Sequence, residues 1–165
     1  MRITSSVEYA ARLMAGLSRL HGQTPVAAEK LSESENVPTG YVNQILLRLK
    51  RAGLVESHRG IGGGYNLSRP PQQIRLSQVV RAVEGEIFES VCGRYEAGKK
   101  DCHHQGDHCG ISPVWQRLGA LIEEYFDGIT LADLIAVKLE SCEKLKMFLD
   151  RESYAYAKRE SGKSS

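Results

Sequence analysis

The 165-residue chain has no apolar run as long as the roughly 18 residues that cross a membrane, and its N-terminal stretch lacks the pattern expected of a secretory leader. Its first residues, MRITSSVEYAARLMAG, contain an early arginine but neither a sustained apolar stretch nor a small-residue cleavage site. These absences predict a cytoplasmic protein without membrane association. Hydrophobic residues still make up 41% of the chain, which is enough for a modest core.

The chain also lacks the signatures of nucleotide-binding and catalytic sites. In the glycine-rich stretch RGIGGGY, Tyr65 stands where a dinucleotide-binding fingerprint needs glycine, and a predicted strand follows where that fingerprint needs a helix. No Lys-Ser or Lys-Thr pair follows, which excludes a P-loop. No set of nucleophile, base and orienting residue is readable. We therefore predict a protein that is not an enzyme, over the alternatives of a thiol oxidoreductase or a zinc hydrolase.

Net charge is small, at +2, but it is unevenly distributed. Residues 1–81 hold 11 Lys and Arg against 5 Asp and Glu, a net +6, whereas residues 82–165 hold 11 against 15, a net −4. The basic N-terminal half is therefore the part expected to meet a polyanion.

This basic half begins with a predicted helix over SSVEYAARLMAGLSRL. Apolar residues mark one helical face, namely Val7, Ala10, Ala11, Met14 and Leu17. Ser5 and Glu8 have the spacing of a capping box, and Gly22 ends the segment. A second, short helix is predicted to start at Thr24-Pro25 and to continue through VAAEKLSE.

A third helix is predicted after Pro38, capped by Thr39 and ended by Gly53. Its predicted buried face consists of Val42, Ile45, Leu46 and Leu49. Its opposite face is polar and basic and consists of Gly40, Asn43, Gln44, Leu47 and Arg51, with Arg48 and Lys50 nearby. A short helix, a tight turn and a basic helix in succession predict a helix-turn-helix.

Two β segments, residues 54–58 and 65–68, follow and are joined by the glycine-rich turn. A hairpin after a helix-turn-helix predicts a winged helix, so the fold class is mainly α with a small β wing.

The predicted DNA contacts lie on the third helix and the wing. Asn43 and Gln44 are of the types that read adenine edges, and Arg59 can enter a narrow minor groove. Gly62 and Gly63 allow the wing backbone to approach DNA closely. Predicted phosphate contacts are Thr39, Tyr41, Arg48 and Arg51. The alternatives are an ordinary solvated helix face and a plain hairpin turn.

The second half predicts further helices. Residues 74–84 bury Leu76, Val79, Val80 and Val83, and residues 113–126 carry an apolar stripe of Leu118, Leu121, Ile122 and Tyr125. Thr130 and Asp133 cap a last helix that continues through LADLIAVKLESCEKLKMFL. The predicted regions are a DNA-binding domain (1–84), a polar loop (85–112), dimerisation and C-terminal helices (113–157) and a disordered tail (158–165).

Three of the four cysteines lie in the polar loop, in CGRYEAGKKDCHHQGDHC. In a reducing compartment such cysteines are metal ligands or redox groups rather than disulfides. Gaps of nine and six residues between Cys92, Cys102 and Cys109 lack the close pairs of structural zinc sites. Zinc with the loop histidines (His103, His104, His108) and an iron-sulfur cluster both stay open on spacing alone. Cys142 is predicted to be a thiol outside any cluster.

Several stretches resemble the winged-helix iron-sulfur repressor family of IscR-, NsrR- and RirA-like transcription regulators. They are MRITSSVEYAARLM, RLKRAGLVESHRGIGGGYNL and the three-cysteine loop followed by ITLADLI, over residues 1 to about 136. The resemblance implies a homodimeric bacterial regulator, mostly repressing, that binds a palindromic operator and dimerises through residues 113–126. It also implies that Cys92, Cys102 and Cys109 bind a 2Fe-2S or 4Fe-4S cluster that senses iron, redox or nitric oxide status.

The chain departs from that family pattern at the loop. Its first gap is longer than usual, and Ser112 stands where the cluster-assembly branch has a histidine. The resemblance makes Glu8 of the partner subunit a candidate fourth ligand, with His103, His104 and His108 as competitors and the capping box as the other role of Glu8. A cluster-free regulator controlled by cysteine thiol chemistry, zinc or a protein partner is the alternative function.

Overall fold

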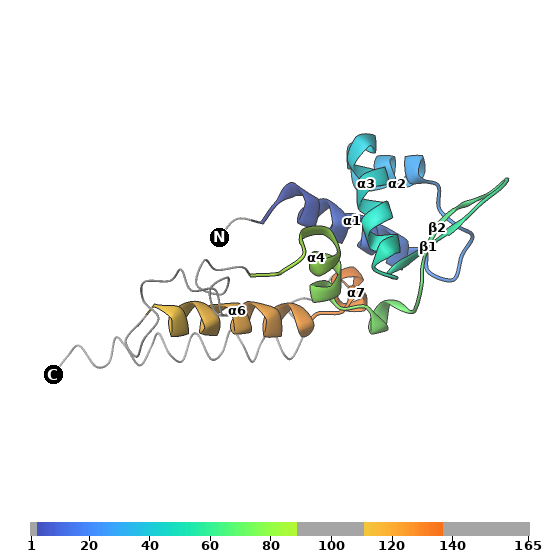
Figure 1. Cartoon of the computed structure of the whole chain (residues 1–165). Coiled ribbons are helices and arrows are strands. Elements are labelled where there is room, and N and C mark those ends of the chain that lie inside the picture. The colour runs from blue at the N-terminus through green and yellow to red at the C-terminus, as the bar shows by residue number, and fades with distance from the viewer. Residues whose placement is uncertain (1–2, 89–110, 137–165) are drawn as a thin grey trace, which may run out of the picture.

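The computed structural model describes residues 3–88 and 111–136 as a set of helices with one two-stranded sheet (Figure 1). The elements in chain order are α1 (Ser5–Arg19), α2 (Ala28–Glu35), α3 (Thr39–Arg51), β1 (Val55–His58), β2 (Gly64–Leu67), the 3-10 turn η1 (Pro71–Gln73), α4 (Leu76–Glu84), α6 (Ser112–Asp127) and α7 (Leu131–Ile135). The predicted fold class, mainly α with a small β wing, is confirmed. In the described residues no helix is long and apolar enough to cross a membrane.

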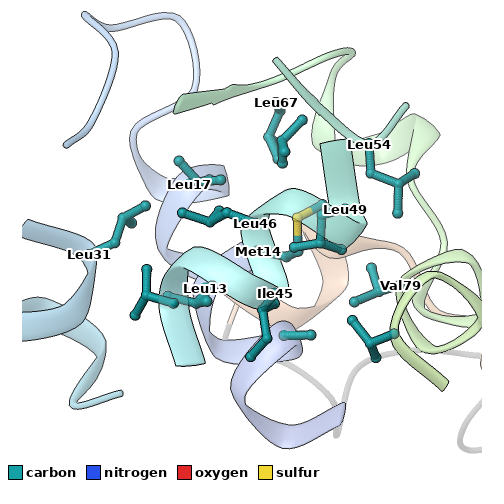
Figure 2. Close-up of a cluster of buried hydrophobic side chains, with 14 of the residues drawn as sticks. Leu13, Met14, Leu17, Leu31, Ile45, Leu46, Leu49, Leu54, Leu67 and Val79 are labelled. Carbon is teal, nitrogen blue, oxygen red and sulfur yellow. The ribbon is translucent and has the colours of Figure 1, made fainter. Parts of the chain in front are cut away.

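The core lies between α1, α2, α3 and α4, where leucine and methionine side chains meet (Figure 2). The predicted buried face of α3 is confirmed, since all four of its members are at most 3% exposed. On α1, Leu13 is fully buried although it lies outside the predicted stripe. It is buried because α1 is contacted by α2, α3, α4 and α7, so more than one face is covered.

The start of α1 differs from the predicted capping box. Thr4 is the N-cap residue, and its hydroxyl accepts a hydrogen bond from the Val7 amide at 3.4 Å. Ser5 is the first helical residue, and Glu8 pairs instead with Arg12 one turn further along. Thr4 and Ser5 are both good N-cap types, so local pattern alone could not separate these adjacent positions.

The start of α2 was also predicted too early. The helix begins at Ala28 rather than at Thr24-Pro25. Val26 is extended and exchanges two backbone hydrogen bonds with Tyr65 of β2, at 3.0 and 2.9 Å. This pairing joins residues far apart in the chain, so the local signal of a cap followed by proline could not reveal it.

The predicted hairpin is confirmed as the antiparallel pair β1 and β2, with Val55 opposite Leu67 and His58 opposite Gly64. The fold itself requires some of its glycines. A Cβ at Gly63 would lie 2.5 Å from the His58 carbonyl oxygen, and one at Gly64 would lie 2.4 Å from the Val26 carbonyl oxygen. At Gly63 and Gly64 the backbone therefore closely approaches other parts of the protein itself.

The predicted helices of the second half are confirmed within the described residues. α4 packs against α1, and α6 follows beneath α4 in Figure 1. α6 begins at Ser112, with Ile111 in the N-cap position. The predicted capping box of Thr130 and Asp133 starts α7, which ends at Ile135. The predicted continuation of this helix, Cys142 and the predicted tail lie outside the described residues.

Candidate nucleic-acid interface

The outward surface of α3 is set by its turn from α2. The Ser32 hydroxyl donates to the Val37 carbonyl at 2.7 Å and lies 3.0 Å from the Thr39 hydroxyl. Burial of one face then exposes the other, which consists of Thr39, Gly40, Tyr41, Asn43, Gln44, Leu47, Arg48, Lys50 and Arg51. All predicted DNA-contact residues of the third helix are thus exposed. Thr39 is also engaged with α2, which fixes the first turn of the helix.

The two edges of this surface are held by contacts within the protein. On one edge, the Tyr41 ring meets the Tyr9 ring edge-to-face at 5.4 Å, and the Arg48 guanidinium donates to the Val83 carbonyl at 2.6 Å. On the other edge, Lys50 donates to the Ser57 hydroxyl of β1. The wing is therefore tied to the C-terminal turn of α3.

Between these edges runs a line of residues spaced at i, i+4, i+7 and i+11, which we call the central stripe: Gly40, Gln44, Leu47 and Arg51. Gln44 and Arg51 have no hydrogen-bond partner among the residues that the structure describes. Asn43 lies beside the stripe and is likewise exposed without such a partner. These three polar side chains are therefore available to contact a ligand. The last turn of α3 is basic.

The wing presents a different surface. Arg59 and Ile61 are exposed at its tip, and Ile61 is fully exposed. Gly62 has a φ of +78° and open space around it, which fits the predicted close approach. Gly63 is partly covered, and its missing Cβ makes room for the hairpin backbone. Ile61 was not among the predicted contacts, although its place between two glycines of the predicted turn was visible in the sequence.

The described residues on either side of the cysteine segment, Phe88 and Ile111, both lie at α6. Before it, the Phe88 ring lies 6.5 Å from the Trp115 ring, and a Cβ at Gly119 would come within 2.9 Å of Phe88. After it, Ile111 leads directly into α6. The predicted ligands Cys92, Cys102, Cys109, His103, His104 and His108 lie outside the described residues.

Polar contacts hold α6 against α4. Ser77 donates to the Asp127 carboxylate, and Arg75 donates to the Asp127 backbone carbonyl at 2.6 Å. Arg81 and Glu123 form an ion pair at 2.9 Å, and this hydrogen bond raises the pKa of Arg81 above its usual value. These contacts hold the C-terminal half of α6 against α4.

Glu8 lies near the start of α1, with its side chain 56% exposed and paired with Arg12. The same end of α1 is joined to the end of α4, because the Thr4 hydroxyl donates to the Glu84 carboxylate at 2.6 Å. In the part of the chain that the structure describes, no group of three His, Cys, Asp or Glu side chains could hold a metal ion.

The apolar stripe of α6 is only partly covered within the described residues: Leu121, Ile122 and Tyr125 are half-buried, and no α6 residue is fully buried. Leu118, from the predicted stripe, is 37% exposed. The stripe also extends toward the N-terminus of the helix through exposed side chains that were not predicted, Ile111, Val114 and Trp115. Their spacing continues that of Leu118, so helical periodicity could have found them.

The comparisons with known proteins agree with this geometry. The Rrf2 family, described as an iron-dependent transcriptional regulator, matches residues 3–137. The HTH-type transcriptional regulator IscR of Sodalis glossinidius is 35% identical over 136 residues, which cover 82% of this chain and 79% of that protein.

Solved structures are similar as well. T. potens IscR has a TM-score of 0.68 and 28% identity, covering 86% of this chain and 90% of its own. CymR, the global cysteine regulator of B. subtilis, has a TM-score of 0.67 and 26% identity, covering 84% of this chain and 98% of its own. The family match spans most of the chain and includes the helix-turn-helix, the wing and α6. The chain therefore belongs to the Rrf2 family of transcription regulators.

Proposed function

We propose that this protein is a homodimeric repressor whose operator binding is controlled by an iron-sulfur cluster on residues 85–112. The observation that carries the proposal is the hydrogen bond from Arg48 of α3 to the Val83 carbonyl. It connects the exposed helix that would read DNA to the last turn of α4, just before the cysteine segment. A change in that segment can therefore alter the position of α3.

For DNA recognition, we propose that Asn43 and Gln44 read base edges in the major groove while Arg51 holds a phosphate. Thr39, Tyr41 and Arg48 are further phosphate contacts, of which Tyr41 and Arg48 also support the helix from its edge. Arg59 would enter the minor groove, with Gly62 and Gly63 shaping the wing. Two copies of this surface on a dimer fit a palindromic operator.

For the dimer, we propose that the apolar stripe of α6 packs on a second copy. Leu118 and Trp115 are each 37% exposed and Val114 is 53% exposed. Exposing this apolar surface to water costs free energy, and association would remove that cost. The two flanks of the cysteine segment lie on this same helix. Dimer geometry and the segment are therefore mechanically connected.

For the cofactor, the donor set fits an iron-sulfur cluster, since three thiolates and a carboxylate are all ligands that iron accepts. Cys92, Cys102 and Cys109 would hold it, and Glu8 of the partner subunit would supply the fourth ligand. The Glu8 carboxylate is exposed and its partner Arg12 is also exposed, so Glu8 can turn to another group. When bound, the cluster would make the state of this segment depend on iron, oxidation or nitric oxide.

A second candidate is a cluster-free regulator controlled by cysteine thiol chemistry, zinc or a protein partner. The similarity to CymR, whose structure is described as that of a global cysteine regulator, supports this second candidate. It would use the same DNA-reading surface and the same dimer helix.

Anaerobic purification of the full chain separates the two functions. We expect bound iron and sulfide with visible absorption, and we expect affinity for a duplex selected from a random DNA library to change about 5- to 150-fold after exposure to air or nitric oxide. A colourless, iron-free protein that still binds the selected duplex would favour the cluster-free function.

Glu8→Ala and Arg12→Ala form a matched pair for the fourth ligand. Both remove the ion pair, but only Glu8→Ala removes the carboxylate. If Glu8 is a ligand, its variant alone changes the absorption spectrum and the iron count. Identical spectra and iron counts for both variants and the unmodified protein would exclude it.

A further inference from the structure

The central stripe of α3 contains one large apolar side chain, Leu47. It is 47% exposed and lies one turn after Gln44 and one turn before Arg51. The core residues of the helix occupy the opposite face, so Leu47 contributes little to the core. Tyr41, the other exposed large hydrophobic residue of α3, rests against Tyr9 at the edge.

A single exposed leucine is ordinary on a protein surface, so exposure alone decides nothing. Its position is informative because residues three and four apart on a helix point the same way. Leu47 shares its face with Asn43, Gln44 and Arg51. A binding partner that contacts these polar side chains therefore also contacts Leu47. The charge of the last turn, with Arg48, Lys50 and Arg51, makes a polyanion the complementary occupant.

The floor of the DNA major groove offers hydrogen-bonding atoms at every base pair but only one apolar group, the C5 methyl of thymine. Amide side chains in the same stripe are suited to adenine, whose partner carries that methyl. We propose that Leu47 contacts thymine methyl groups and selects for A·T pairs next to those read by Asn43 and Gln44. This inference rests on the proposed DNA-reading function of α3.

The expected size of the effect follows from removing one methyl group from water. It corresponds to roughly fourfold in affinity for each half-site, and to roughly 15-fold for a dimer that loses both contacts. An effect of this size is measurable by fluorescence anisotropy, provided that the salt concentration is held fixed.

The test uses the anaerobically purified full chain and a duplex selected from a random library. Each symmetry-related pair of thymines is replaced in turn by deoxyuridine, which pairs identically but lacks the methyl group. We expect the unmodified protein to lose affinity at one pair of positions, and Leu47→Ala to bind the thymine and deoxyuridine duplexes equally well there. Arg51→Ala serves as the control, because it should weaken both duplexes and keep the difference between them.

The outcomes separate a failure of this inference from a failure of the proposed DNA-reading function. If the unmodified protein binds selected DNA tightly but no deoxyuridine replacement weakens it, the methyl contact is overturned and DNA reading by α3 stands. If Leu47→Ala keeps the deoxyuridine effect, another residue makes the contact and the inference fails. If Leu47→Ala changes the oligomeric state instead, Leu47 belongs to a protein interface. If no duplex is selected, both the inference and the proposed function fail.

Discussion

The helices α3 and α6 have the same kind of amphipathic pattern but different surroundings. α3 buries all four residues of its apolar face against the rest of the chain. α6 buries none, although Val114, Trp115 and Leu118 follow each other at helical spacing. Periodicity therefore shows that a helix has an apolar face, but it does not show whether the covering surface belongs to the same chain.

The way that α6 is attached sharpens this difference. Ser77, Arg75 and Arg81 of the α4 region hold it through polar contacts with Asp127 and Glu123. Its apolar stripe is thus left available while its position is fixed. Substitutions in the buried face of α3 should therefore act on folding, and substitutions in the stripe of α6 should act on association.

The largest effect is expected in the core. Leu46 is fully buried, so Leu46→Ala should lower the free energy of unfolding by about 2 to 5 kcal/mol, because it removes apolar contacts and leaves a cavity. Urea unfolding followed by circular dichroism measures it. Leu47→Ala, one residue further and half exposed, is the control, with an expected change within about 0.5 kcal/mol. Equal losses for both variants would mean that α3 does not divide into a core face and an outer face.

An intermediate effect is expected on association. Leu118→Lys places a charge in the apolar stripe, so the dimer dissociation constant should rise at least about tenfold, which sedimentation measures. Helix content and unfolding of the DNA-binding unit should stay the same. Ala120→Lys, at an exposed position on another side of α6, adds the same charge and should leave the dimer intact. Equal dimer strength in both variants would contradict a role for the stripe.

The smallest effect is expected where α4 and α6 meet in water. Arg81 and Glu123 are both nearly half exposed, so Arg81→Ala should cost at most about 1 kcal/mol in unfolding free energy. A double-mutant cycle with Glu123→Ala isolates the pair, and its coupling should weaken in high salt. A coupling free energy above about 1 kcal/mol that does not change with salt concentration would contradict this prediction. It would show that the pair is shielded from water and contributes strongly to the attachment of α6.

Much of the fold was predictable because its elements are set by local pattern. The buried face of α3, the hairpin and the limits of α4 and α6 follow from residue spacing and from glycine and proline positions. Apart from the N-cap of α1, the failures involve contacts between distant residues. Val26 pairs with Tyr65, which shortens α2, and α1 buries Leu13 because it is surrounded by α2, α3, α4, α7 and β2.

The candidate site shows the same division. Spacing correctly placed Asn43, Gln44 and Arg51 on the outer face of α3. It could not show that Arg48 is hydrogen-bonded to the Val83 carbonyl, because that partner lies on a different helix. The tie between α3 and the approach to the cysteine segment is thus a property of the tertiary structure alone.

The glycine run of the wing has a practical consequence. Gly63 and Gly64 are fixed by backbone atoms of the protein itself, so side chains cannot be introduced there without rebuilding the hairpin. Ile61 is fully exposed between glycines that have open space around them. A fluorescent or cross-linking group at position 61 would leave the packing undisturbed, and the wing tip thus offers a reporter position from which the approach of a partner can be observed directly.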